Sequence, residues 1–175
     1  MTIYTIGHST RTIEEFIALL NAHRIEILVD IRSFPMSRRL PHFNRENMER
    51  SLTDDGIEYL WMKDLGGRRK RELKDSPNVA LRNESFRNYA DYMLTLQFQS
   101  AIDKLLELAA GKRVAIMCAE ALYFRCHRML VSDFLAAHGH EVLHIIDKQA
   151  PSPHTLMQEA RMIDGRLLYR GDRLL

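Results

Sequence analysis

The segment MCAEALYFRCHR, residues 117–128, brings together several side chains capable of chemistry. It contains both cysteines of the chain and four further polar residues: Cys118, Glu120, Arg125, Cys126, His127 and Arg128. Thiols, a carboxylate, an imidazole and guanidinium groups at this spacing suit a catalytic site, a metal site or an anion-binding site. They also suit a strand that runs into a helix and whose polar side chains only hold the intervening loop in place.

Cys118 follows an apolar run and precedes a predicted helix, as the nucleophilic cysteine of thiol phosphatases and sulfurtransferases does. Those enzymes carry a tight loop with an arginine six positions after the cysteine. Here Arg125 lies seven positions after Cys118, with no glycine between them. The alternative is therefore a buried structural cysteine. A reactive Cys118 should have a pKa well below the reference of about 8.5.

Cys118, Cys126 and His127 are also candidate zinc ligands. Structural zinc sites usually offer cysteines about two to four residues apart, whereas these two are eight apart. The spacing argues against zinc, and the sequence predicts no metal ligands.

Glu120, His8 and Asp30 are the candidate catalytic residues. Glu120 could act as a general base or hold a ribose hydroxyl, or it could form a salt bridge with a nearby arginine. His8 could be a general acid or base, or it could fix its loop through a backbone contact. Asp30 alternates with Arg32 along a strand, so the two could form a catalytic pair or a structural ion pair.

Short apolar strands alternate along the chain with amphipathic helices. The expected strands cover residues 3–6, 25–31, 57–65, 114–117 and 142–146. Helices are expected to begin at the Thr12 capping box, at Asn44, near Ser85, at His127 and at Thr155. The helix near Ser85 is predicted to be long and to end at Gly111, and the last helix is predicted to run to Met162.

This alternation predicts an α/β fold: a single domain over residues 1–175, with a mostly parallel sheet of about five strands and helices on both faces. Pro151 and Pro153 interrupt the pattern. Residues 151–175 are therefore expected to form a C-terminal extension packed on the domain. The turn signal Asp164-Gly165 predicts a small hairpin within that extension.

The polar clusters follow the predicted strands at their carboxyl ends. In a parallel sheet these ends lie on one edge, where ligands bind, provided that the third strand is parallel too. The candidate substrate-binding residues on this edge are Ser9, Arg32, Arg38, Gly67, Arg68, His127 and Arg128. Arginine binds phosphate through a planar two-pronged fork, and a helix N-terminus also favours anions. The sequence therefore predicts an anion-binding pocket, with phosphate as the leading ligand.

The overall composition limits the class of protein. A net charge of +2 is too small to imply nucleic-acid binding by itself. The opening MTIYTIGHST does not resemble a signal peptide, and no run of about 20 apolar residues suggests a membrane span. Two cysteines are too few for a disulfide framework. We expect a cytoplasmic protein with reduced thiols and no membrane association; the cofactor is unknown and the oligomeric state is open.

Four motifs, GHS, DIRSFPMSR, GIEYLWMKDLGGRR and MCAE…CHR, resemble those of a bacterial and archaeal family, domain of unknown function 488. The matching positions are Gly7, His8, Ser9, Glu15, Phe16, Asp30, Arg32, Pro35, Ser37, Arg38, Gly66, Gly67, Arg68, Cys118, Glu120, Cys126, His127 and Arg128. The segment around Asp164-Gly165 is similar as well. The stretch between Glu120 and Cys126 departs from the family pattern, because it is apolar where the family is commonly polar. The resemblance implies that the motifs belong to one site, and it implies no substrate.

The leading hypothesis is an enzyme, a hydrolase or transferase, that acts on a phosphate-bearing small molecule or a nucleic acid. Four arginines would bind the anion: Arg32, Arg38, Arg68 and Arg128. Glu120 or Asp30 would act as base, with His8 as acid or orienting group. Three alternatives stay open: a non-catalytic nucleotide or nucleic-acid binding module that uses the basic run 68–74, a thiol-dependent enzyme that uses Cys118, and a metal-dependent hydrolase.

Overall fold

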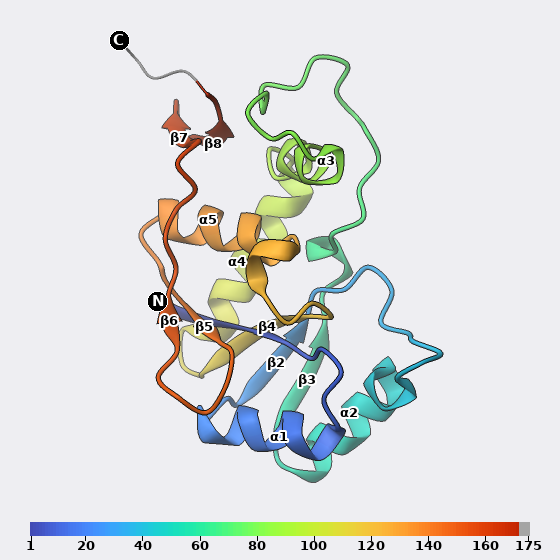
Figure 1. The fold of residues 1–175 in the computed structure, drawn as a ribbon. Helices are drawn as coiled ribbons and strands as arrows, with labels where there is room; N and C mark the ends of the chain where they lie inside the picture. Colours follow the sequence, from blue (N-terminus) through green and yellow to red (C-terminus); the bar gives the residue numbers. More distant parts are fainter. Residues whose placement is uncertain (172–175) are drawn as a thin grey trace.

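The main sheet of the computed structural model, which describes residues 1–171, has six strands in the order β3-β2-β4-β1-β5-β6 (Figure 1). The strands are β1 (Thr2–Gly7), β2 (Ile27–Asp30), β3 (Glu58–Trp61), β4 (Val114–Cys118), β5 (Glu141–Ile145) and β6 (Ser152–Pro153). The first five are parallel, and only β6 pairs antiparallel, with β5. The predicted α/β class is confirmed, and the third strand meets the parallel condition.

The central strands are apolar because both of their faces are buried. Every residue of β2 is buried, and so are the first four of β4. Successive side chains alternate between two cores. Ile27 and Val29 belong to one core, whereas Leu28 belongs to the other. The sheet is thus the middle layer of a three-layer structure.

Five helices cover the two faces of the sheet (Figure 1). They are α1 (Ile13–Ala22), α2 (Arg45–Asp54), α3 (Glu84–Tyr92), α4 (Leu96–Ala109) and α5 (Arg128–Ala137). Helices α1 and α2 lie on one face, and α3, α4 and α5 lie on the other. The predicted capping box is confirmed, since Thr12 and Glu15 each bond the backbone N–H of the other. None of these helices, within the described residues, is both long and apolar enough for a membrane span.

Two predicted helices are wrong. The long helix from Ser85 to Gly111 is two helices, because the chain leaves α3 at Met93 and Thr95 caps a new helix, α4. The predicted helix from Thr155 to Met162 is absent within the described residues. Its last part forms strand β7 (Ala160–Ile163), which pairs antiparallel with β8 (Arg166–Tyr169). Apolar spacing over so short a segment does not distinguish a strand from a helix.

The predicted hairpin at Asp164-Gly165 is confirmed by the β7–β8 pairing. Both turn residues have positive φ, 49° at Asp164 and 74° at Gly165. Such a two-residue turn suits the twist of the paired strands and favours Asp-Gly. The hairpin contacts the rest of the protein through Tyr169, whose carbonyl accepts from the Ala80 N–H at 3.1 Å.

A line of buried hydrogen bonds connects the sheet to the C-terminal segment. Thr5 Oγ1 lies 2.7 Å from His144 Nδ1, and His144 Nε2 lies 2.9 Å from His154 Nδ1. His154 Nε2 in turn lies 2.8 Å from Asp133 Oδ1, and Tyr169 donates its hydroxyl to Asp133 Oδ2 at 3.0 Å. Since the carboxylate only accepts, His154 Nε2 carries the proton of its hydrogen bond with Asp133.

Candidate functional site

A cavity of about 400 Å³ lies at the carboxyl edge of the sheet, and we refer to it as the edge cavity. The residues after β2, β3 and β4, the start of α3 and the approach to α5 all contribute to it. Its lining consists of Arg32, Ser33, Phe34, Met36, Gly67, Arg68, Ser85, Phe86, Cys118, Ala119, Glu120, Cys126 and His127. Five of the predicted site residues therefore share one cavity: Arg32, Gly67, Arg68, Glu120 and His127.

Arg32 is buried at this cavity and forms an ion pair with Asp30. Its Nη2 lies 2.6 Å from Asp30 Oδ2, and its Nε lies 2.9 Å from Asp30 Oδ1. Tyr59 donates its hydroxyl to the same carboxylate at 2.6 Å. Burial and the Asp30 charge raise the pKa of Tyr59 above its ordinary value, which keeps the phenol as the donor. Asp30 is fully buried and does not line the edge cavity.

His8 is packed behind Arg32. Its Nδ1 donates to the Ser9 carbonyl at 2.8 Å, and its Nε2 accepts from Arg32 Nη1 at 3.3 Å. The ring stacks on Phe43 with centroids 4.2 Å apart. Burial lowers the pKa of His8 to about 4, so the ring is neutral near pH 7. His8 is therefore engaged through both nitrogens and lies outside the cavity lining.

Ser9 orders the loop after β1. Its φ of 52° is left-handed, and its N–H donates to the Ala119 carbonyl at 2.9 Å. The preceding Gly7 lies so close to the Glu120 carbonyl that a Cβ at this position would collide with it. The glycine thus allows the loop after β4 to pass directly over the end of β1.

Arg128 is the largest fully buried side chain of the described residues, with 1% of its surface exposed. Its Nη2 donates to the carbonyls of Glu120 and Ala121, and its Nε donates to Cys126 Sγ at 3.2 Å. All of these acceptors belong to the β4–α5 loop, residues 119–127. Arg128 points inward and shapes this loop.

The β4–α5 loop brings the two cysteines and His127 together. The ligand atoms of Cys118, Cys126 and His127 all lie within 4.8 Å of one another. His127 Nε2 donates to the Ile31 carbonyl at 2.9 Å, and its Nδ1 lies 4.0 Å from Cys118 Sγ. Gly67 contacts this ring, because a Cβ there would collide with Nδ1. The sequence offers the same three residues as zinc ligands, and the eight-residue gap that argues against them does not keep their ligand atoms apart.

The acid–base properties of the two thiols differ. The Cys118 thiol as hydrogen-bond donor and the Arg128 guanidinium lower the pKa of Cys126 to about 6. The same hydrogen bond and burial raise the pKa of Cys118 above its ordinary value. The prediction for a reactive Cys118 was a low pKa, whereas here the more acidic thiol is Cys126.

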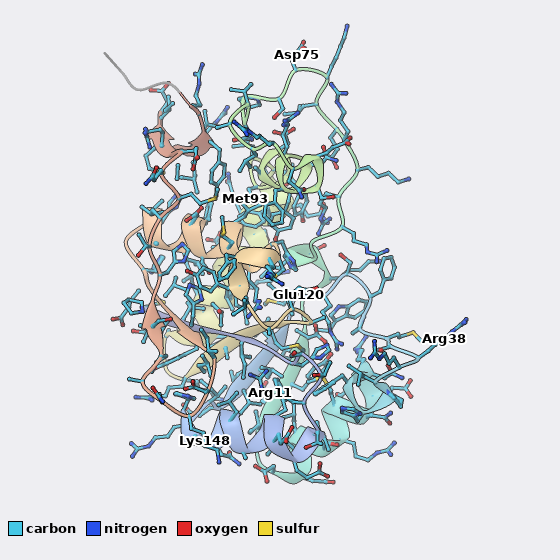
Figure 2. All side chains as sticks on the ribbon, viewed as in Figure 1. Arg11, Arg38, Asp75, Met93, Glu120 and Lys148 are labelled. Carbon is cyan, nitrogen blue, oxygen red and sulfur yellow. The ribbon has the colours of Figure 1, made fainter. Side chains whose placement is uncertain are left out.

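Arg68 and Glu120 are the exposed charged residues of the edge cavity. The Arg68 guanidinium lies 5.5 Å from the centroid of Phe34, a ring that is 65% exposed. The Arg68 N–H donates to Ser33 Oγ at 2.9 Å. Figure 2 places Arg38 at the outer end of the loop after β2, well apart from Glu120, and Arg38 does not line the cavity.

Comparisons with known proteins give a family and no further relative. No curated protein and no solved structure is significantly similar to the chain. A family model, Domain of unknown function DUF488, matches residues 12–135. This range covers more than half of the chain, including every residue that lines the edge cavity. His8 and Ser9 lie before it. The chain therefore belongs to the family described as Domain of unknown function DUF488.

Proposed function

We propose that the edge cavity binds a phosphate-bearing ligand, a nucleotide or a nucleic-acid end, and that the protein is an enzyme acting on it. The observation that carries this proposal is the pairing of an exposed guanidinium, Arg68, with an exposed ring, Phe34, at one cavity. A guanidinium binds phosphate in a planar, bidentate manner. An exposed aromatic ring is a platform on which any base can stack.

The size of the cavity supports a ligand of this kind. Sites for small molecules usually enclose about 300–1,000 Å³, and the edge cavity measures about 400 Å³. Its wall combines apolar side chains, such as Phe86 and Met36, with a few polar ones. That combination suits a ligand with one aromatic and one charged part.

The predicted arginines divide into two roles in this proposal. Arg68 contacts the phosphate directly, since its side chain is exposed at the cavity. Arg32 forms part of the wall, but Asp30 compensates its charge and its donors are directed at Asp30, at His8 and at the Phe43 carbonyl, so it positions the wall. Arg128 acts as a positioning residue, because its donors are directed at backbone carbonyls and a sulfur. Arg38 takes no part in binding.

Replacing Arg68 tests the ligand class. Melting temperatures would be recorded with phosphate, sulfate, mononucleotides and short single strands, since a ligand at 100 times its Kd adds about 2.7 kcal/mol to stability. A nucleotide should raise the melting temperature of the wild type and have little effect on Arg68→Ala. Arg50→Ala, an equal charge change on the exposed side of α2, should keep the wild-type response. A folded wild type that responds to no anion would contradict the proposal.

Replacing Glu120 tests whether the site is catalytic. Glu120 is the exposed carboxylate of the edge cavity and the proposed general base. Glu120→Gln should retain ligand binding and lose turnover by about 10²–10⁴-fold, the usual contribution of general acid–base catalysis. Turnover of the nucleotide found above would be followed by phosphate release or by group transfer. An unchanged rate would remove Glu120 from the mechanism, and ligand binding without any turnover by the wild type would favour a binding module.

A further inference from the structure

We propose that Cys118, Cys126 and His127 form a zinc site whose fourth coordination position opens into the edge cavity. All three residues line this cavity, and their three ligand atoms lie within 4.8 Å of one another. Two thiolates and one imidazole are a typical zinc ligand set, and three protein ligands with one open position are typical of catalytic zinc. The proposal does not rest on the phosphate-bearing ligand proposed above, although both lie at the same cavity, because cobalt binding can be measured without that ligand.

The orientation of His127 supports a metal-ligand role. The Ile31 carbonyl can only accept a hydrogen bond, so the nitrogen that contacts it, Nε2, carries the proton. Nδ1 therefore presents its lone pair, and it lies 4.0 Å from Cys118 Sγ. Metal-binding histidines usually donate their other N–H in this way to a carbonyl or carboxylate, which fixes both tautomer and ring orientation.

The surroundings of Arg128 support a thiolate at Cys126. A buried charge is costly unless an opposite charge lies nearby. Within residues 1–171, no carboxylate lies at ion-pair distance from Arg128. The guanidinium donates its Nε–H to Cys126 Sγ at 3.2 Å instead. The thiolate is the form of cysteine that binds metals, and this N–H···S contact is the kind of outer interaction that orients a sulfur ligand.

The eight-residue gap between the cysteines has a structural explanation. The short spacing of structural zinc sites belongs to ligands that share one turn. Here Cys118 ends a strand, whereas Cys126 and His127 precede a helix, and Arg128 holds the connecting loop through its carbonyls. With two thiolates and a neutral imidazole, a bound Zn²⁺ makes the ion and its three ligands neutral together, and the Arg128 guanidinium stays beside a sulfur that keeps partial negative charge.

Cobalt substitution tests the site directly. The reduced full-length protein would be stripped with a chelator under anaerobic conditions and titrated with Co²⁺. We expect one ion per chain, a thiolate-to-cobalt charge-transfer band, visible bands of tetrahedral intensity, and displacement by Zn²⁺. Zinc should also protect both thiols from alkylation. A folded, reduced protein without a charge-transfer band would overturn the proposal, and so would a protein whose cysteines form a disulfide while the reduced form takes up no metal.

Two variants distinguish ligation from a general loss of structure. Cys118→Ser removes one sulfur ligand and should abolish or halve the charge-transfer band. Gly67→Ala keeps every ligand but places a methyl group against His127 Nδ1. Because the clash displaces the ring, it should weaken Co²⁺ binding by about 10–100-fold, the range expected when the orientation of a ligand is disturbed. Gly111→Ala, where a Cβ meets nothing within 4 Å, is the matched control. If Gly67→Ala bound as tightly as that control, His127 would not be a ligand.

Discussion

Arg128 illustrates that the role of a residue depends on the path of the chain around it, which the sequence pattern does not determine. Arg68 lies in the segment after β3 and Arg128 begins α5, and anion binding was predicted for both. In the structure Arg68 is exposed at the edge cavity, whereas Arg128 is enclosed and donates to Glu120 and Ala121. The sequence pattern predicts that these arginines lie at the carboxyl edge of the sheet. It does not predict whether the side chain faces solvent or backbone.

Arg128→Met should destabilise the protein strongly. The variant leaves the Glu120 and Ala121 carbonyls of the β4–α5 loop without this donor and removes the packing of a fully buried side chain, and an unsatisfied group that is buried costs about 1–3 kcal/mol. We expect a loss of about 2–5 kcal/mol in the free energy of unfolding, measured by urea denaturation. Arg125→Met changes an exposed arginine in the same loop and should stay within about 0.5 kcal/mol of the wild type. Equal stability of the two variants would show that Arg128 does not hold the loop.

At the scale of elements, the alternation of strands and helices is sufficient to predict the sheet, but it does not predict where each helix ends. The helical spacing of apolar residues runs from Phe86 through Tyr89, Ala90 and Met93 toward Ile102, and it favours one long helix. The break depends on Thr95, whose side chain accepts from the Phe98 N–H and donates to the Tyr92 carbonyl. A threonine within a helical pattern fits a helix interior as well as a cap, so the pattern alone does not locate the break.

Thr95→Ala tests this account of the α3–α4 break. Loss of an N-cap side chain costs about 0.5–2 kcal/mol, so the free energy of unfolding should fall by about 1 kcal/mol. Thr53→Ala, an exposed threonine within α2, should be neutral or slightly stabilising because alanine has the higher helix propensity. Chemical denaturation of the two variants side by side gives the comparison. A neutral Thr95→Ala would mean that packing, and not the cap, ends α3.

In the candidate site, too, some features could be predicted from the order of strands and helices and others depend on local loop structure. Parallel strands place their carboxyl ends on one edge, and for this reason the convergence of Arg32, Gly67, Arg68 and Glu120 on one cavity could be predicted. The sequence offers Cys118, Cys126 and His127 as zinc ligands but their spacing argues against it, because their approach to within 4.8 Å depends on the path of the β4–α5 loop. His8 and Asp30 also lie at strand ends, but burial directs them into a network with Arg32.

At the scale of the whole molecule, the buried hydrogen-bond line from Thr5 to Asp133 makes stability depend on pH. Burial lowers the pKa of His144 to about 3, compared with about 6.5 in the unfolded chain. The unfolded state therefore binds a proton that the folded state excludes between these two values. His144 contributes its full stabilisation above pH 6.5 and loses it as the pH falls toward 3, with a slope of about 1.4 kcal/mol per pH unit.

Urea denaturation between pH 5 and pH 7 would measure this slope. The wild type should become less stable as the pH falls. His144→Leu removes the titrating ring, so it should have a lower stability at pH 7 and a flatter pH dependence. His138→Leu replaces an exposed ring and should keep the wild-type slope. A wild-type slope in His144→Leu would show that other groups cause the acid sensitivity.

The position of β1 in the sheet has a consequence for the order in which the protein can fold. Strand β1 lies between β4 and β5, so that Ile3 pairs with Val114 on one side and with Val142 on the other. During translation, β1 therefore has no partner until more than a hundred further residues have been made. Contacts this distant in sequence form slowly and leave apolar strands exposed meanwhile. We expect a nascent chain that ends before Val114 to depend on chaperones, because β1 and β2 cannot yet pair with β4.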